Sequence, residues 1–266
     1  MMKRLNKQFR FWLIISILIW SACSGDGSVN KENQTPPPSP QSKTVFVLFD
    51  ISDSTKAEET RRKYLDGFDK IIEKIGGGDV LVADFISDDP LGQSSFTINQ
   101  AFPVFKTDTD NELLIKKQKL KFEEEIKTLR EQAKEKAKQM LAGANRTVKK
   151  TKILDANLLA EKVFQKYQRP KNVLVIFSDM KESSEKIDFE KQKMSAETTK
   201  KILEDEKKAS RTPKLSNVQV YVVGASGGNT LDSFNQIQNF WLEYYKAAGA
   251  NLSKENYGAA LLKFDE

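Results

Sequence analysis

The sequence contains no histidine, and this absence removes several classes of site at once. Hydrolases that depend on a histidine base are excluded, and so are the commonest zinc ligands. The single cysteine, Cys23, cannot form a disulfide within the chain. The chain has 266 residues, 39% of them hydrophobic, which is enough to furnish the core of one large domain or two small ones.

A large charge of one sign is also missing once the first 22 residues are set aside. The formal net charge of +6 comes from 43 Lys and Arg and 37 Asp and Glu. Four basic residues precede residue 23, which leaves 39 basic and 37 acidic residues and a net charge of +2. We therefore expect no nucleic-acid partner, because sequence-independent binding to phosphates needs a strong basic excess.

The first 22 residues have the layout of a secretory signal. Lys3, Arg4, Lys7 and Arg10 precede an apolar run from residue 11 to 20, which is about half of the ~20 residues that span a bilayer as a helix. This pattern predicts a cleaved signal peptide over residues 1–22.

Cys23 follows the small residues Ser21 and Ala22, as in a lipoprotein signal, although Trp20 stands where Leu is usual. We expect diacylation of Cys23 and an exported protein anchored to a membrane of the cell envelope. The alternative is a cysteine without a role in an ordinary signal. Residues 23–43 hold the lipidated cysteine and a Pro- and Ser-rich linker that is expected to be disordered, and the folded domain is expected over 44–266.

From residue 44 onward, short apolar runs alternate with helical periodicities. Strands are expected at 44–49, 80–86, 96–105, 172–178 and 218–223. Helices are expected at 56–75, 109–141, 158–167, 195–209 and 230–248, and a short strand or tail at 259–264. Continuous apolar strands without hairpin turns predict an α/β domain with a doubly wound, mainly parallel sheet and helices on both faces. Pro103 places the third strand at the edge of that sheet.

The helix at 109–141 is a long insertion of roughly 45 to 50 Å. A capping box from Thr109 to Glu112 is expected at its start, and its apolar residues share one face. These are Phe122, Ile126, Leu129, Ala133, Ala137 and Met140. We favour a cover for the sheet with a solvated outer face; the alternative is a protruding arm that binds a partner or forms a coiled coil.

Oxygen-bearing side chains directly follow the first strand in the segment Asp50-Ile51-Ser52-Asp53-Ser54. Ligands of open parallel sheets gather at the carboxyl ends of the strands, so this loop is expected on the functional edge. One carboxylate and two hydroxyls suit Mg²⁺ first, or Mn²⁺ or Ca²⁺. In the alternative interpretation, Ser52 or Ser54 only caps the following helix, and Asp53 is expected to lie on the surface.

This segment resembles the metal-ion-dependent adhesion site of von Willebrand factor type A (vWA) domains, written D-x-S-x-S after the first strand. The resemblance covers residues 44 to about 250. It implies two further ligands, a threonine ahead of a helix and an aspartate after the fourth strand. Thr151 or Thr147 matches the threonine and Asp179 the aspartate, although Met180 follows where the family usually has Gly. The implied metal ligands are Asp50, Ser52, Ser54, Thr151 and Asp179.

The function that this resemblance implies is binding and not catalysis, with an acidic side chain of a protein partner completing the shell of the metal. One alternative is a metal-free structural or assembly subunit of an envelope complex that acts through its long helix. A phosphohydrolase with Asp50 as nucleophile is the weakest alternative. Enzymes of the haloacid dehalogenase type need a second Asp where Ser52 stands, and a serine hydroxyl cannot replace that general acid near neutral pH.

Overall fold

The computed structural model describes residues 41–143, 148, 150–225, 230–261 and 263–264. The expected signal peptide, Cys23, most of the linker and Thr147 lie outside the described residues. Within the described part, no helix combines the length and the apolar character that crossing a bilayer requires.

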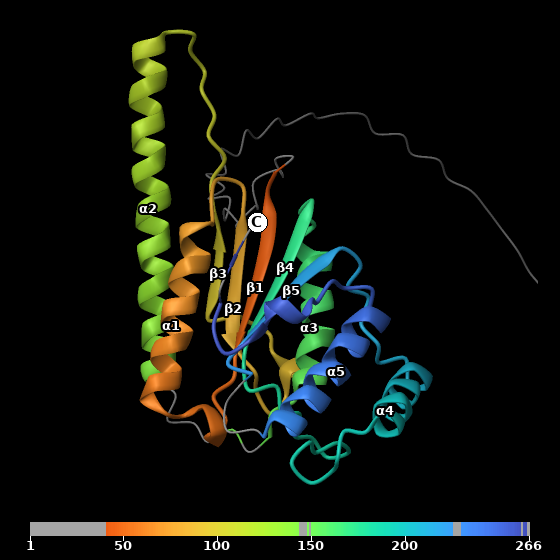
Figure 1. Cartoon of the computed structure of the whole chain (residues 1–266). Helices are drawn as coiled ribbons and strands as arrows, with labels where there is room; N and C mark the ends of the chain where they lie inside the picture. The colour runs from red at the N-terminus through yellow and green to blue at the C-terminus, as the bar shows by residue number, and fades with distance from the viewer. Residues whose placement is uncertain (1–40, 144–147, 149, 226–229, 262, 265–266) are drawn as a thin grey trace, which may run out of the picture. The chain divides into compact units, whose positions relative to one another are not determined.

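Six strands form one sheet in the order β3-β2-β1-β4-β5-β6 (Figure 1). They are β1 Lys43–Phe49, β2 Val80–Phe85, β3 Ile98–Ala101, β4 Lys171–Phe177, β5 Val218–Val223 and β6 Tyr257–Gly258. All neighbouring strands run parallel except β2 and β3, which are antiparallel. The chain leaves β1 toward β2 and later returns to β1's other side with β4, so the order reverses between β1 and β4. This topology confirms the predicted doubly wound α/β fold of the vWA or Rossmann-like kind.

Helices cover both faces of the sheet, as predicted. They are α1 Glu58–Glu73, α2 Glu112–Ala142, α3 Ile153–Tyr167, α4 Ala196–Lys208 and α5 Leu231–Ala247. Side chains of α1 and α2 share one hydrophobic core with Val45, Val47 and Phe49 of β1, while α3 and α5 share the other with Phe46 and Leu48. All seven residues of β1 are buried, because alternate side chains enter opposite cores.

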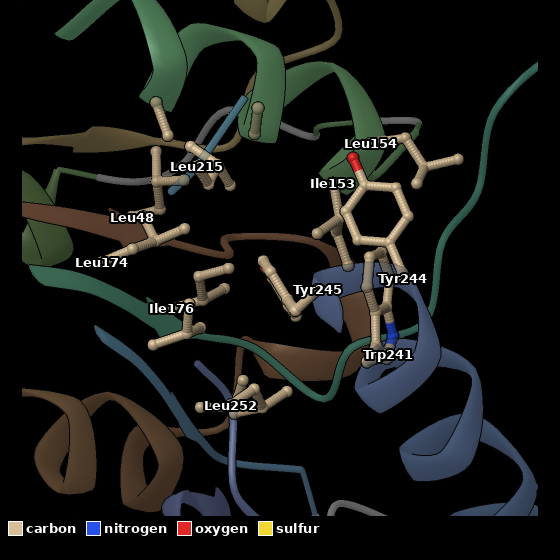
Figure 2. Close-up of a cluster of buried hydrophobic side chains, with 14 of the residues drawn as sticks. Leu48, Ile153, Leu154, Leu174, Ile176, Leu215, Trp241, Tyr244, Tyr245 and Leu252 are labelled. Atoms are coloured by element: carbon tan, nitrogen blue, oxygen red, sulfur yellow. The ribbon is translucent and has the colours of Figure 1, made fainter. Parts of the chain in front are cut away.

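The core under α3 and α5 is rich in aromatic side chains. Figure 2 shows Ile153 and Leu154, at the start of α3, beside Trp241 and Tyr244 of α5. Trp241 and Tyr244 are both fully buried, and their rings meet edge to face with centroids 5.3 Å apart. The Tyr245 hydroxyl of α5 also donates to the Asn157 side-chain oxygen of α3 at 2.8 Å, which ties the N-terminal part of α3 to α5.

Helix α2 buries side chains against the domain only from Ile126 onward. Ile126, Ala133, Ala137 and Met140 are buried there, which confirms most of the predicted apolar face. The N-terminal half instead continues past α1 and beyond the sheet (Figure 1). The favoured interpretation, a cover for the sheet, is therefore correct for the C-terminal part of the helix. The alternative, a protruding arm, is correct for the N-terminal part.

The start of α2 differs from the predicted capping box. Asn111, not Thr109, is the N-cap residue, and its side-chain oxygen accepts hydrogen bonds from the amides of Leu113 and Leu114 at 3.0 and 3.3 Å. Thr109 instead accepts a bond from the Asn111 amide at 3.2 Å. Both residue types cap helices well, so the local pattern alone selected the wrong one.

Three further boundaries differ from the prediction. Helix α3 begins at Ile153 rather than at residue 158, because the Glu182 carboxylate accepts the Leu154 amide at 3.0 Å and so supplies a cap from a distant loop. Strand β3 ends at Ala101, two residues before Pro103, which has no amide to donate to a ladder. The last strand, β6, precedes the predicted range 259–264.

Candidate functional site

The candidate site lies at the carboxyl edge of the sheet, at the point where the strand order reverses. Asp50 follows β1 and Asp179 follows β4 after one intervening residue, and these two strands are neighbours. The Asp50 amide donates to the Phe177 carbonyl at 2.8 Å, which continues the β1–β4 ladder to its end. Two of the predicted ligands are therefore held at the ends of two hydrogen-bonded strands.

The Asp50 carboxylate is 2% exposed and is oriented by two donors. The Ser52 amide donates to Oδ1 at 2.8 Å, and the Ser178 hydroxyl donates to Oδ2 at 2.6 Å. Burial raises the pKa of Asp50, and the bonds from Ser178 and Ser52 lower it in part. The carboxylate is thus fixed in direction but carries a desolvation cost.

Ser52 and Ser54 present their hydroxyls together. Their Oγ atoms lie 3.0 Å apart. Ser52 is the N-cap residue of a short 3₁₀ turn, Asp53–Thr55, yet its side chain makes no capping bond, and the residue before α1 is Ala57. The alternative in which these serines serve as helix caps is therefore wrong. Asp53 lies on the surface as expected and pairs with Lys56.

The Asp179 carboxylate is 4% exposed and incompletely satisfied. Its Oδ1 accepts the Lys181 amide at 3.2 Å, whereas Oδ2 is buried and accepts no hydrogen bond from the described residues. The Lys181 ammonium is 3.9 Å from Oδ2, and also 3.2 Å from Glu190. Burial first, and then the charge of Asp50, raise the pKa of Asp179 to about 6, against the lowering effects of the Lys181 amide, the Ser54 hydroxyl and the Lys181 charge.

Thr151 is buried in a loop that is tied to both other loops. Val148 forms an isolated parallel bridge with Ser52, and the Ser183 amide donates to the Thr151 carbonyl at 2.9 Å. Ser183 belongs to the loop that starts with Asp179. The three predicted loops therefore lie side by side.

Two tyrosines complete the surroundings of the carboxylates. Tyr64 of α1 and Tyr257 of β6 are buried, and neither hydroxyl has a hydrogen-bond partner in the described part of the chain. Burial, and then the charges of Asp50 and Asp179, raise the pKa of Tyr64; burial and Asp179 act in the same direction on Tyr257. Buried polar atoms without partners are rare, and a bound water or ion is a usual explanation.

Met180, directly after Asp179, adopts a left-handed backbone with φ of 63°. This conformation is costly for a residue other than glycine. It is held by the Trp241 indole, which donates to the Met180 carbonyl at 2.9 Å, and by the Met180 amide, which donates to Ser178 Oγ at 2.9 Å. The left-handed backbone at Met180 is thus accommodated by contacts to neighbouring elements.

The donor set fits a hard divalent cation. Besides burial, the charge of Asp50 raises the pKa of Asp179, and a cation between the two carboxylates would offset this repulsion. The hydroxyls of Ser52 and Ser54 stand next to them. No cluster of three or more His, Cys, Asp or Glu side chains that could hold a metal is present among the described residues. Carboxylates, hydroxyl oxygens and water are ligands that suit Mg²⁺ rather than Zn²⁺.

Sequence reasoning missed Ser178, Tyr64 and Thr55. Ser178 bridges Asp50 and Met180, and the Thr55 hydroxyl donates to the carbonyls of Asp50 and Ser52 at 2.8 and 3.0 Å, which closes the loop. Ser178 follows a strand that is buried on both faces, so the sequence did not show which way its hydroxyl points. Tyr64 carried none, because it belongs to the apolar stripe of α1.

No protein-family model matches the chain, and no curated protein matches it. Solved structures give distant matches. Proximal thread matrix protein 1 from the mussel byssus is 14% identical over 78% of this chain and 48% of that chain, with a TM-score of 0.37. A von Willebrand factor type A protein from Catenulispora acidiphila is 11% identical over 78% of this chain and 43% of that chain, with a TM-score of 0.39. The chain thus spans about half the length of these neighbours or less, and the fold assignment depends on the sheet order, not on these likenesses.

Proposed function

We propose that this chain is a membrane-anchored, extracytoplasmic binding protein that engages a protein partner through a divalent-cation site of vWA type. The proposed ligands are Asp50, Ser52, Ser54, Thr151 and Asp179, with Mg²⁺ as the first choice of ion. The observation that carries the proposal is the buried pair Asp50 and Asp179, whose Asp179 Oδ2 has no hydrogen-bond donor among the described residues.

Each residue has a distinct part in this proposal. Asp50 and Asp179 supply negative charge, directly or through water, and Ser178 fixes the direction of Asp50. Ser52 and Ser54 supply neutral oxygens, and so does Thr151. Because the three hydroxyls carry no charge, a bound divalent ion keeps its Lewis acidity and attracts an acidic side chain of the partner.

Catalysis is not part of the proposal. A nucleophilic Asp50 would have to reach a substrate, but its carboxylate is buried and both oxygens accept hydrogen bonds. The position of a general acid two residues later is held by Ser52.

The partner interaction is tested by retention of envelope proteins on the full chain in Mg²⁺, in chelator and with Asp50→Ala. The matched control is Asp53→Ala, which removes a carboxylate of the same loop that is exposed and paired with Lys56. We expect a partner that is retained by the wild type and Asp53→Ala in Mg²⁺ and lost with chelator and with Asp50→Ala. A partner held equally in chelator contradicts the proposed mode of binding.

The anchor is tested by mass spectrometry of the N-terminal peptide of the mature protein isolated from its host. We expect the mature chain to begin at Cys23 with lipid on its thiol and a mass increase of a diacylglyceryl group. A mature chain that begins elsewhere, or an unmodified Cys23, refutes the anchor and leaves the cation site untouched.

A further inference from the structure

The N-terminal half of α2, residues 112–125, has one face without a partner. None of these residues is buried, and Leu113 and Leu120 are 79% and 60% exposed. We refer to residues 112–125 as the arm. In Figure 1 the arm extends beyond the sheet, at the edge opposite the candidate site.

The inner face of the arm is supported by the chain segment that precedes α2. The Phe105 and Phe122 rings lie 5.5 Å apart, and the Thr107 hydroxyl and the Gln118 side-chain oxygen are 2.9 Å apart. Gln118 also donates to Asp108 at 3.3 Å. The arm is therefore held in a defined direction by its own base, while its outer face is left uncovered by the described residues.

The outer face carries a line of residues spaced by four and three. At 3.6 residues per turn, Leu113, Lys117, Leu120 and Glu124 fall along one side of the helix, opposite Phe122. This spacing is that of a helix seam that packs against a second helix. In a monomer, two leucines on such a line expose apolar surface to water, which is unfavourable. In a pair of helices they form part of the contact surface.

The charges of the arm are sorted into two blocks. After Glu112 at the tip, four basic residues are followed by three acidic ones: Lys116, Lys117, Lys119 and Lys121, then Glu123, Glu124 and Glu125. In the described structure no ion pair within 4.0 Å involves any of these seven side chains. A complementary partner must present acidic and then basic groups in the reverse order.

A second copy of the arm in antiparallel orientation has this reverse order. We infer that two copies of this chain pair through the outer faces of their arms about a two-fold axis beside Leu120. The axis places Lys117 of one copy opposite Glu124 of its partner, and the symmetry repeats the pair. An anionic lipid surface fits less well, because the glutamate block and the acidic Asp108, Asp110 and Glu112 at the tip would oppose it.

Disulfide formation in the full chain tests the axis. In Leu120→Cys, the two introduced thiols meet across the axis and give a covalent dimer on mild oxidation. The matched control is Leu113→Cys on the same exposed line, whose two copies lie about 21 Å apart in an antiparallel pair, too far for a disulfide. The unsubstituted chain gives the background from Cys23. Equal yields for the two variants, or none above background for Leu120→Cys, overturn the inference.

Charge exchange in the Leu120→Cys background tests the complementarity. Lys117→Glu places a negative charge opposite Glu124 of the second copy, and we expect the pairing to weaken about 10-fold. We expect the same weakening for Glu124→Lys, which places a positive charge opposite Lys117. The double variant restores the complementary pairs and is expected to return the yield to within about threefold of the starting value. A single variant without effect, or a double variant that stays weak although its thermal unfolding is unchanged, overturns the inference. A lipid surface would replace the second copy as the partner if two results were found together. These are binding of the chain to phosphatidylglycerol vesicles that Lys117→Glu abolishes, and no dimer of Leu120→Cys. Together they overturn the inference.

Discussion

Asp179→Asn should stabilise the metal-free protein although it removes a proposed ligand. The ionised Asp179 is buried next to Asp50, and Oδ2 accepts no hydrogen bond from the described residues. Asparagine keeps an acceptor for the Lys181 amide, which now bonds to Oδ1 at 3.2 Å, and removes the repulsion between the two carboxylates. Without a cation, the substitution therefore removes a cost and preserves the loop.

The size of the effect follows from the pKa of Asp179, which rises from 3.8 to about 6 in the fold. A group with a raised folded pKa contributes stability that is fully present below the unfolded pKa and is lost as the pH rises through the folded one. The wild type should therefore lose up to about 3 kcal/mol through this group between about pH 4 and pH 7. Asp179→Asn does not titrate and should be more stable by about 2 to 3 kcal/mol near pH 7.5, with no gain near pH 4.

Urea unfolding of the full chain, with chelator and with Mg²⁺, measures this difference. Saturating Mg²⁺ should stabilise the wild type by about 2.7 kcal/mol at 100 times its Kd and leave Asp179→Asn unchanged, which closes the gap. Asp53→Asn, on the exposed carboxylate of the neighbouring loop, should behave as the wild type in both media. A metal-free Asp179→Asn that is less stable than the wild type near pH 7.5 would refute the reasoning.

Three substitutions near the site give further predictions. Burial raises the pKa of Glu182 to about 8. The wild type should therefore lose up to roughly 1.4 kcal/mol of stability per pH unit between about pH 4.5 and 8 relative to Glu182→Gln, as measured by urea unfolding across that range. Parallel stability curves for the two proteins would count against a buried, protonated cap. Trp241→Phe removes the hydrogen bond to the Met180 carbonyl. It should cost about 1 to 3 kcal/mol of stability and weaken the stabilisation by Mg²⁺ in thermal unfolding. Unchanged stability would show that this bond does not hold the turn. Gly224→Ala should cost about 1 to 3 kcal/mol in the same assay, because φ is +102° and the new Cβ would lie 3.0 Å from Tyr64; a neutral result would contradict the close packing beside the site.

The predictable part of the fold was its sheet. Strands such as β1 and β5 are continuous apolar runs, and a run of this kind without hairpin turns leaves little alternative to a buried parallel strand. The start of α3 was not predictable, because its cap is the side chain of Glu182 from a loop 28 residues away. The sequence also did not show whether α2 covers the sheet or protrudes. Its helical periodicity continues past the point where the neighbouring elements end.

The predictable part of the candidate site was its carboxylates. Asp50 follows a buried strand directly and Asp179 follows one after a single residue, and strand ends of a parallel sheet share one edge. The partners of these carboxylates were not predictable. Ser178 lies at the end of a strand that is buried on both faces, so no alternation of polar and apolar residues showed which way its hydroxyl points. Tyr64 is indistinguishable in sequence from the other core residues of α1.

The most direct test of the central proposal is titration of the full chain with Mn²⁺, followed by the electron paramagnetic resonance signal of the free ion. We expect one Mn²⁺ bound per chain, displaced by Mg²⁺, with the binding lost in Asp50→Ala and in Asp179→Ala and kept in Asp53→Ala. Absence of binding by the wild type, or equal binding by all four proteins, would contradict a cation site between β1 and β4.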